Sequence, residues 1–293
     1  MPGAHGTLRW PGIVVLIVVA LVVLVAATLI AAARRWADGT AELRGRLQAA
    51  RTAIAPATFD QAAIATLPPP VQRYFRAVLT DGQPMIAAVH LAHEGVFNSS
   101  TDQVRWSAFT STQLVITQRP GFDWDARIHM APGVAVRVHD AYAGGEGMLH
   151  AAVSGLVTVA DMRGSSQMAQ GELLRFLAEA TWYPTRLLPG NGMSWDAIDD
   201  STARATLRDG DVDASLEFHF DAQGFVREVS TPARDRTVGD RLVPTPWRGR
   251  FWNYVLRNGV RIPLDGEVEW VLSDGTFPYW RGHITSIAFE FTR

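Results

Sequence analysis

A strongly helical, largely apolar segment at residues 168–184 constrains the fold most, because β-type sequence lies on both sides of it. Its polar residues Glu172, Arg175 and Glu179 share one narrow stripe, on which Arg175 can pair with both carboxylates. Apolar side chains cover most of the remaining surface: Leu173, Leu174, Phe176, Leu177, Ala180 and Trp182. A helix that is apolar over most of its circumference belongs inside a protein. The sequence therefore predicts a central, buried helix over about residues 168–183.

Alternating apolar and polar residues on both sides of this helix predict strands. The pattern is clear in residues 122–130 and 214–220. Tight hairpin turns are indicated by Asp209-Gly210, Asn258-Gly259 and Asp274-Gly275. About ten to twelve sequential antiparallel strands follow, and sheets of that size curl. We expect a mainly β (α+β) fold, in which a strongly curved antiparallel sheet or open barrel wraps on the central helix.

Residues 12–33 carry no charge, and Thr28 is their only polar side chain. At 1.5 Å per residue a helix of this length crosses the roughly 30 Å hydrocarbon core of a bilayer. The apolar core of a signal peptide is usually shorter, and Arg34-Arg35 makes a poor cleavage flank. The sequence therefore predicts one transmembrane helix after an N-terminal tail, residues 1–11, in a single-pass protein of the cell (inner) membrane.

The basic residues near this segment bear on its orientation. Arg9 and the α-amino group precede it, whereas five arginines follow it: Arg34, Arg35, Arg44, Arg46 and Arg51. The positive-inside rule then places the soluble domain in the cytoplasm, by a modest margin that leaves the side open. Residues 34–58 are expected to form a helical stalk or linker. Residues 59–293 are expected to form a single curved-sheet domain, with helices at about 59–79 and 168–183.

Composition excludes several classes of function. A net charge of -2 and a pI near 6.4 argue against a nucleic-acid binder. Cysteine is absent, which excludes thiolate catalysis, cysteine-ligated zinc and disulfides. The eight histidines show no metal-binding spacing, and the glycines of residues 144–147 have the context of a turn rather than of a phosphate loop. We expect no metal, no cofactor and no nucleic-acid partner.

Ten tryptophans are the strongest compositional oddity. Tryptophan usually packs in a core, but aromatic walls around the hollow of a curved sheet also suit a hydrophobic ligand. The leading hypothesis is a membrane-anchored binding module, without catalysis, for a lipid or other apolar molecule. Its expected lining residues are Trp124, Leu173, Leu177, Trp182 and Trp270. Three arginines are candidates to meet a headgroup, or to pair with nearby carboxylates: Arg127, Arg163 and Arg281.

Two alternatives remain open. Glu146 and His150 are four apart on a predicted strand and share a face, so they could perform general acid–base chemistry in an apolar cavity. An enzyme acting on a membrane-derived substrate is thus one alternative, although ion pairing explains the same residues. A non-catalytic protein that contacts another membrane protein, its partners unknown, is the other alternative.

Five blocks of sequence resemble an uncharacterised bacterial family: residues 122–130, 163–184, 195–207, 244–251 and 277–284. The resemblance runs from about Leu67 to the C-terminus. That family has no established activity, so the resemblance implies no catalytic residues. The expected order of elements is also similar to that of periplasmic lipoprotein carriers and their mycobacterial lipid-binding relatives, in which a half-barrel covers an apolar cavity. This second likeness implies an extracytoplasmic domain, contrary to the arginine count.

Overall fold

A computed structural model describes residues 10–100, 103–239 and 241–292. Most of the predicted N-terminal tail, residues 1–9, lies outside the described residues. The helices are α1 (Trp10–Ala49), η1 (Gln61–Ile64), α2 (Pro69–Val78), α3 (Ser166–Glu179), η2 (Ala180–Trp182) and η3 (Pro184–Leu187), the η elements being 3₁₀ helices. The strands are β1 (Ile86–Asn98), β2 (Trp106–Ile116), β3 (Gly121–Ala131), β4 (Val134–Ala143), β5 (Glu146–Val153), β6 (Val157–Arg163), β7 (Met193–Ala197), β8 (Thr202–Asp209), β9 (Val212–Phe220), β10 (Val226–Val238), β11 (Arg241–Arg257), β12 (Val260–Leu272) and β13 (Gly275–Phe291).

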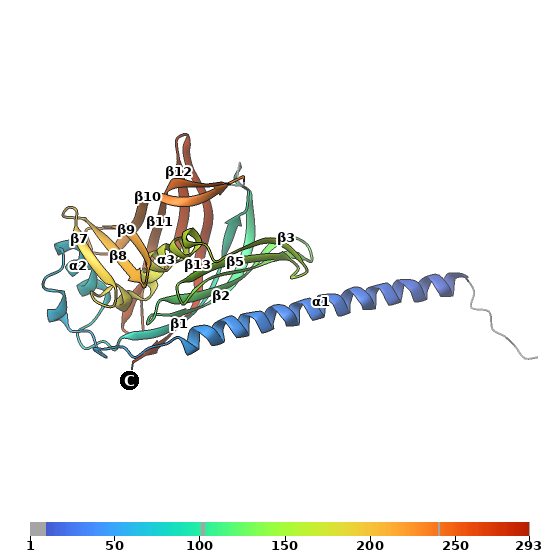
Figure 1. The fold of residues 1–293 in the computed structure, drawn as a ribbon, viewed down its shortest axis with the longest axis horizontal. Helices are drawn as coiled ribbons and strands as arrows, with labels where there is room; N and C mark the ends of the chain where they lie inside the picture. Colours follow the sequence, from blue (N-terminus) through green and yellow to red (C-terminus); the bar gives the residue numbers. More distant parts are fainter. Residues whose placement is uncertain (1–9, 101–102, 240, 293) are drawn as a thin grey trace, which may run out of the picture.

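The described strands form one antiparallel sheet of 13 strands in the order β6-β5-β4-β3-β2-β1-β13-β12-β11-β10-β9-β8-β7. Two meanders, β1–β6 and β7–β13, are joined where β1 pairs with β13. The predicted Asp-Gly and Asn-Gly turns fall between β8 and β9, β11 and β12, and β12 and β13. The sheet curves but leaves β6 and β7 as free edges (Figure 1). This confirms the predicted curved antiparallel sheet in its open form.

Helix α3 connects the two free edges and lies in the hollow of the sheet (Figure 1), touching β4 and β5 on one wing and β9 and β10 on the other. Its N-terminus is capped by Ser165, whose side chain accepts from the Met168 amide. Gly147 lets β5 approach this first turn, because a Cβ there would lie 2.5 Å from the Met168 carbonyl oxygen. The predicted central helix is therefore confirmed, and it holds both wings together.

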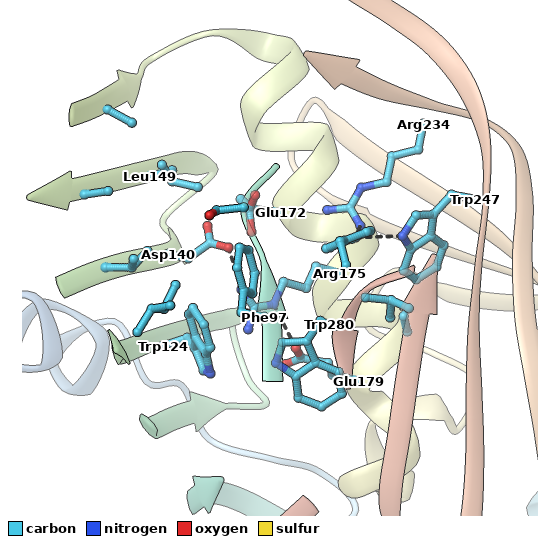
Figure 2. Close-up of a pocket in the computed structure, with 18 of the residues that line it drawn as sticks. Phe97, Trp124, Asp140, Leu149, Glu172, Arg175, Glu179, Arg234, Trp247 and Trp280 are labelled. Carbon is cyan, nitrogen blue, oxygen red and sulfur yellow. Dashed lines mark hydrogen bonds and ion pairs between the residues drawn. The ribbon is translucent and has the colours of Figure 1, made fainter. Parts of the chain in front are cut away.

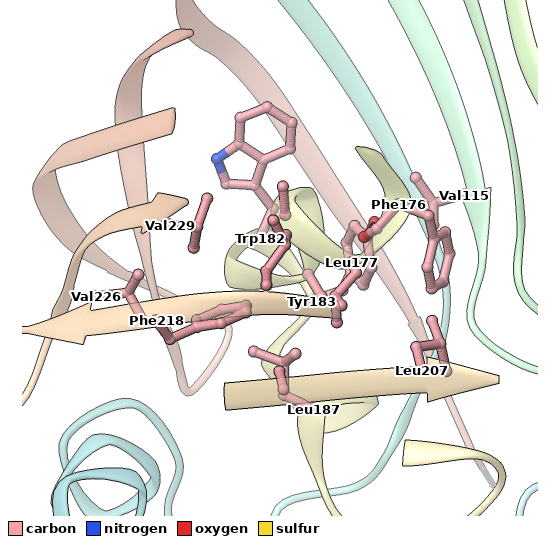
Figure 3. Packing of buried hydrophobic residues seen from close by; sticks show 14 of the residues in the cluster. Val115, Phe176, Leu177, Trp182, Tyr183, Leu187, Leu207, Phe218, Val226 and Val229 are labelled. Carbon is pink, nitrogen blue, oxygen red and sulfur yellow. Dashed lines mark hydrogen bonds between the residues drawn. The ribbon is translucent and has the colours of Figure 1, made fainter. Parts of the chain in front are cut away.

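The core lies between α3 and the β7–β10 wing (Figure 3). Phe176, Leu177 and Tyr183 are fully buried against strand residues that include Leu207 and Phe218. Tyr183 donates its hydroxyl to the Phe176 carbonyl at 2.7 Å, which satisfies the one polar atom of a buried ring. Because this face of α3 packs against the β7–β10 wing, its side chains are apolar.

Helix α1 continues from the apolar segment into the segment expected as a stalk, and its second half packs on the outer face of the sheet. Trp36, Leu43 and Leu47 are buried there, the last against Leu114 and Ile116 of β2. The Trp36 ring stacks on His139, and its Nε1 donates to Asp125 Oδ1 at 3.0 Å. The residues up to Ala49 are thus a docked part of the domain, which fixes the direction in which the apolar half leaves it.

Candidate functional site

A cavity of about 580 Å3 lies between α3 and the concave face of the sheet (Figure 2). Its volume falls within the range of small-molecule pockets. Most of its lining is apolar and comes from both meanders: Phe97, Trp124, Ile128, Val138, Leu149, Trp182, Trp247, Phe251, Val268, Trp270, Tyr279 and Trp280. Strand alternation explains most of the strand residues in this set, since every second residue of a strand faces the hollow. Trp182 comes from η2, and the neighbours Tyr279 and Trp280 both line the cavity at a register shift between β12 and β13. The cavity suits an apolar ligand.

The polar stripe of α3 faces this cavity instead of solvent. Arg175 Nη1 lies 2.5 Å from Asp140 Oδ2 of β4, and its Nε lies 2.7 Å from Glu179 Oε1. Gln113 donates to the second oxygen of Glu179 at 2.6 Å. The expected partnership of Arg175 with Glu179 is confirmed, but its second carboxylate is Asp140 rather than Glu172. Asp140, distant in sequence, is closer to the Arg175 guanidinium than Glu172 on the same helix.

Glu172 is a buried carboxyl group at the edge of this cluster. Burial raises its pKa well above the ordinary value of 4.5, and the nearby Asp140 carboxylate raises it further. The raised pKa favours the protonated form of Glu172, which can donate a hydrogen bond. A hydrogen bond between the Glu172 and Asp140 carboxyl groups contributes to this shift, whereas Trp182 Nε1 is buried without a hydrogen-bond partner among the described residues. All three residues line the cavity, so polar groups converge at one end of an apolar space.

Arg234 of β10 adds a cation to the cavity wall. Its guanidinium lies over the Trp247 ring at 5.0 Å (Figure 2) and over the Trp270 ring at 6.0 Å. It donates to the Tyr279 hydroxyl and the Gly171 carbonyl, each at 3.3 Å. The ion pairs within the described residues do not include Arg234. A half-buried guanidinium with spare donors and no carboxylate partner is suited to an anionic group.

The structure separates the predicted lining residues into two groups. Trp124, Trp182 and Trp270 line the cavity. Leu173 and Leu177 are fully buried in the core and do not line the cavity. Helix α3 thus turns its apolar surface to the core and its polar stripe to the cavity, which Trp182 reaches from η2.

None of the three arginines expected near a headgroup lines the cavity. Arg127 is exposed on β3, on the face opposite Trp124. Arg163 pairs with Asp161 at 2.6 Å on the edge strand β6. Arg281 pairs with Glu267 and lies over the Trp106 ring at 5.1 Å. Arg234, which lines the cavity together with Arg175, could not be singled out because its T-P-A-R-D-R-T surroundings lack a regular alternation.

Glu146 and His150 do not face the cavity, which corrects the expectation for a catalytic pair. Glu146 is exposed at the start of β5. His150 lies on the outer face of the sheet, where its ring stacks on Trp36 at 5.6 Å and its Nδ1 is 3.7 Å from Asp161. The register of β5 turns His150, and Met148 and Ala152 on the same face of the strand, toward α1 and away from the cavity.

His93 of β1 is buried beneath the cavity between Trp182 and Trp280. Burial, together with the positive charge of Arg175, lowers the pKa of His93 to about 3. Its Nδ1 lies 3.3 Å from the Ser111 hydroxyl. The ring is therefore neutral and serves as a polar spacer among aromatic rings. No three His, Asp or Glu side chains converge on a metal-binding geometry in the part of the chain that the structure describes.

The sequence matches one family model, and its fold is similar to two solved structures. Residues 65–289 match the model of a family of unknown function (DUF6920), a range that contains all five blocks named above and confirms that resemblance. No curated protein sequence matches the chain. A LolA superfamily protein from Nitrosomonas europaea is similar in structure, with 11% identity, 75% of this chain and 92% of that chain covered, and a TM-score of 0.40. A beta-barrel-like protein of domain family DUF1849 from Brucella abortus has 9% identity, covers 70% and 99%, and has a TM-score of 0.22.

Proposed function

Since this chain belongs to the DUF6920 family, whose function is unknown, we propose a function from its cavity: the protein is a membrane-anchored binding module that holds a lipid or other apolar molecule. The observation that carries the proposal is an aromatic cavity of about 580 Å3 in the hollow of the sheet. A filled interior would have closed that space with side chains. The proposal invokes no reaction, and the Glu146 and His150 pair lies outside the cavity.

The polar end of the cavity favours an amphiphile over a wholly apolar ligand. Trp182 Nε1 and the spare donors of Arg234 both offer hydrogen bonds. Such an arrangement suits a head that accepts hydrogen bonds or carries negative charge. The apolar part of the ligand would then lie along Trp124, Val138 and Leu149.

Helix α1 supports the membrane anchor. It is the one described helix long and apolar enough to cross a membrane, with a mean hydropathy of 3.5 over its most apolar window and no part of that window buried. The same helix docks on the sheet from Ala32 onward. A segment that both exposes an apolar surface and packs on its own domain is suited to hold that domain against a bilayer.

The test compares two alanines on the two free edges of the sheet. Ala160 of β6 lines the cavity, whereas Ala197 of β7 is exposed. The full chain and its Ala160→Trp and Ala197→Trp variants are purified in detergent and examined by native mass spectrometry after detergent removal. We expect a bound lipid mass on the wild type and on Ala197→Trp, and its loss on Ala160→Trp. Equal retention by both variants, or no bound mass on any of them, would rule the proposal out.

A further inference from the structure

We infer that two hairpin tips, residues 130–134 between β3 and β4 and residues 154–157 between β5 and β6, insert into the headgroup region of the bilayer that α1 crosses. This inference rests on the proposed membrane anchor, but not on any ligand in the cavity. The partner is a lipid surface that contains anionic headgroups. The inference follows from where the tips lie along α1, from their composition and from the charges behind them.

The β5–β6 turn touches α1 where its apolar segment ends. Arg35 Nη2 donates to the Gly155 carbonyl at 3.2 Å. A Cβ on Gly155 would lie 3.7 Å from the Ala32 carbonyl oxygen and 3.8 Å from the Trp36 ring. The uncharged segment runs to Ala33. If that segment fills the hydrocarbon core, this turn is at the level of the membrane surface.

The β3–β4 hairpin reaches farther in the same direction. Val153, the last residue of β5, pairs with Val136, and the Ser154 amide donates to the Ala135 carbonyl at 2.7 Å. Strands β3 and β4 continue beyond that point to the pair Ala131 and Val134. Each further strand residue adds about 3.3 Å. In Figure 1 these green hairpins extend beside α1 toward its apolar half, so their tips come to the membrane surface or slightly below it.

Both tips are apolar and uncharged. Residues 130–134 read M-A-P-G-V and residues 154–157 read S-G-L-V. Met130 is 49% exposed, Val134 40%, Leu156 41% and Val157 63%. Such residues on neighbouring turns lose contact with water if a bilayer covers them, and they would otherwise form a contiguous exposed apolar patch. Because the tips lie beside the apolar half of α1, the bilayer is the surface that would shield them from water.

Arginines stand directly behind the tips. Arg127 and Arg137 are directly opposite each other on β3 and β4, an arrangement in which like charges destabilise a sheet. Neither Arg127 nor Arg137 takes part in an ion pair among the described residues, whose ion pairs involve other arginines. No described carboxylate therefore offsets the repulsion between these two arginines. Lipid phosphates would relieve it, and Arg34 and Arg35 lie at the same end of the docked helix.

Residues at and next to these tips form part of the cavity rim. Met130, Val136 and Val159 belong to the cavity lining, and Met130 and Val159 are also exposed. Insertion of the tips therefore brings the mouth of the cavity to the bilayer. An amphiphile would pass between membrane and cavity without its apolar part crossing water.

The test uses single spin labels, since the chain has no cysteine. The full chain carries Val134→Cys, Val157→Cys, Leu21→Cys in α1 or Asp211→Cys in the exposed β8–β9 turn, and is reconstituted in vesicles of phosphatidylcholine and phosphatidylglycerol. Collision rates with oxygen and with a water-soluble nickel chelate are measured. We expect labels at positions 21, 134 and 157 to favour oxygen, and the label at 211 to favour the chelate. Combining Arg127→Gln with Arg137→Gln should raise chelate access at position 134.

The labels distinguish failure of the tip insertion from failure of the membrane anchor. Chelate access at 134 and 157 equal to that at 211, with position 21 still in the bilayer, would overturn the insertion and leave the anchor intact. Labels at 134 and 157 shielded from both reagents would overturn it in favour of a protein partner. A label at position 21 that favours the chelate would overturn the anchor and the insertion together. Lipid retention in the cavity is measured separately, so its failure does not bear on these labels.

Discussion

The guanidinium of Arg175 lies 2.5 Å from the carboxylate of Asp140 and thereby joins the central helix to strand β4 at the floor of the cavity. Glu179 completes the cluster from the same helix, 2.7 Å away. Burial alone lowers the pKa of Arg175, but Glu179 and Asp140 together hold it above its ordinary value. The Arg175 guanidinium therefore stays protonated.

We expect Arg175→Met to destabilise the protein by about 3–5 kcal/mol, because it leaves the Asp140 and Glu179 carboxylates buried without their cation. The control is Arg204→Met, which removes the exposed pair with Glu217 and should cost less than about 1 kcal/mol. Chemical unfolding of the full chain in detergent, followed by tryptophan fluorescence, measures both. Equal losses in the two variants would contradict the structural role of the cluster.

Glu172 should make stability fall as pH rises. Its pKa is raised in the folded state, so above the ordinary value of 4.5 the folded protein keeps a proton that the unfolded chain releases. The free energy of unfolding then decreases through that window, by at most about 1.4 kcal/mol per pH unit. Glu172→Gln keeps the group neutral and should flatten this slope above pH 4.5. An unchanged slope in the variant would show that Glu172 is ionised in the folded protein.

His93 should have the opposite effect at acid pH. Its pKa is lowered from 6.5 to about 3, so the unfolded chain binds a proton before the folded protein does. The stabilisation that comes from keeping His93 neutral is complete above pH 6.5, and it is lost as the pH falls toward 3. His93→Gln should reduce the acid sensitivity of unfolding. The exposed His129→Gln on β3 serves as control and should keep the wild-type profile; a matching change in both variants would contradict the burial effect.

Local pattern was sufficient to predict much of the fold. The alternation in residues 122–130 correctly assigned Trp124 to the inner face, and the apolar surface of residues 168–183 correctly predicted a helix inside a curved sheet. Contacts between distant segments were not predictable in this way. Asp140 and Arg175 approach each other only because the sheet curves, and a docked Trp36 gives no signal that distinguishes it from a side chain on an exposed stalk.

The candidate site was predicted only in part, for the same reason. Strand alternation tells which face a side chain takes but not which part of that face encloses space. Leu177 and Trp182 lie on one apolar surface, yet only Trp182 lines the cavity. Arg234 reaches the cavity from β10 through a register shift near Thr231, which breaks the alternation that would have revealed it.

The central claim is that the cavity holds an amphiphile, and photo-crosslinking at two tryptophan positions tests it most directly. Trp270 lines the cavity, whereas Trp252 is exposed on β11. Benzoylphenylalanine replaces one or the other in the full chain, which is irradiated after purification from membranes and examined by intact mass spectrometry. We predict an added mass of a membrane lipid at position 270 and none at position 252. Equal addition at both positions, or detergent alone at position 270, would contradict the claim.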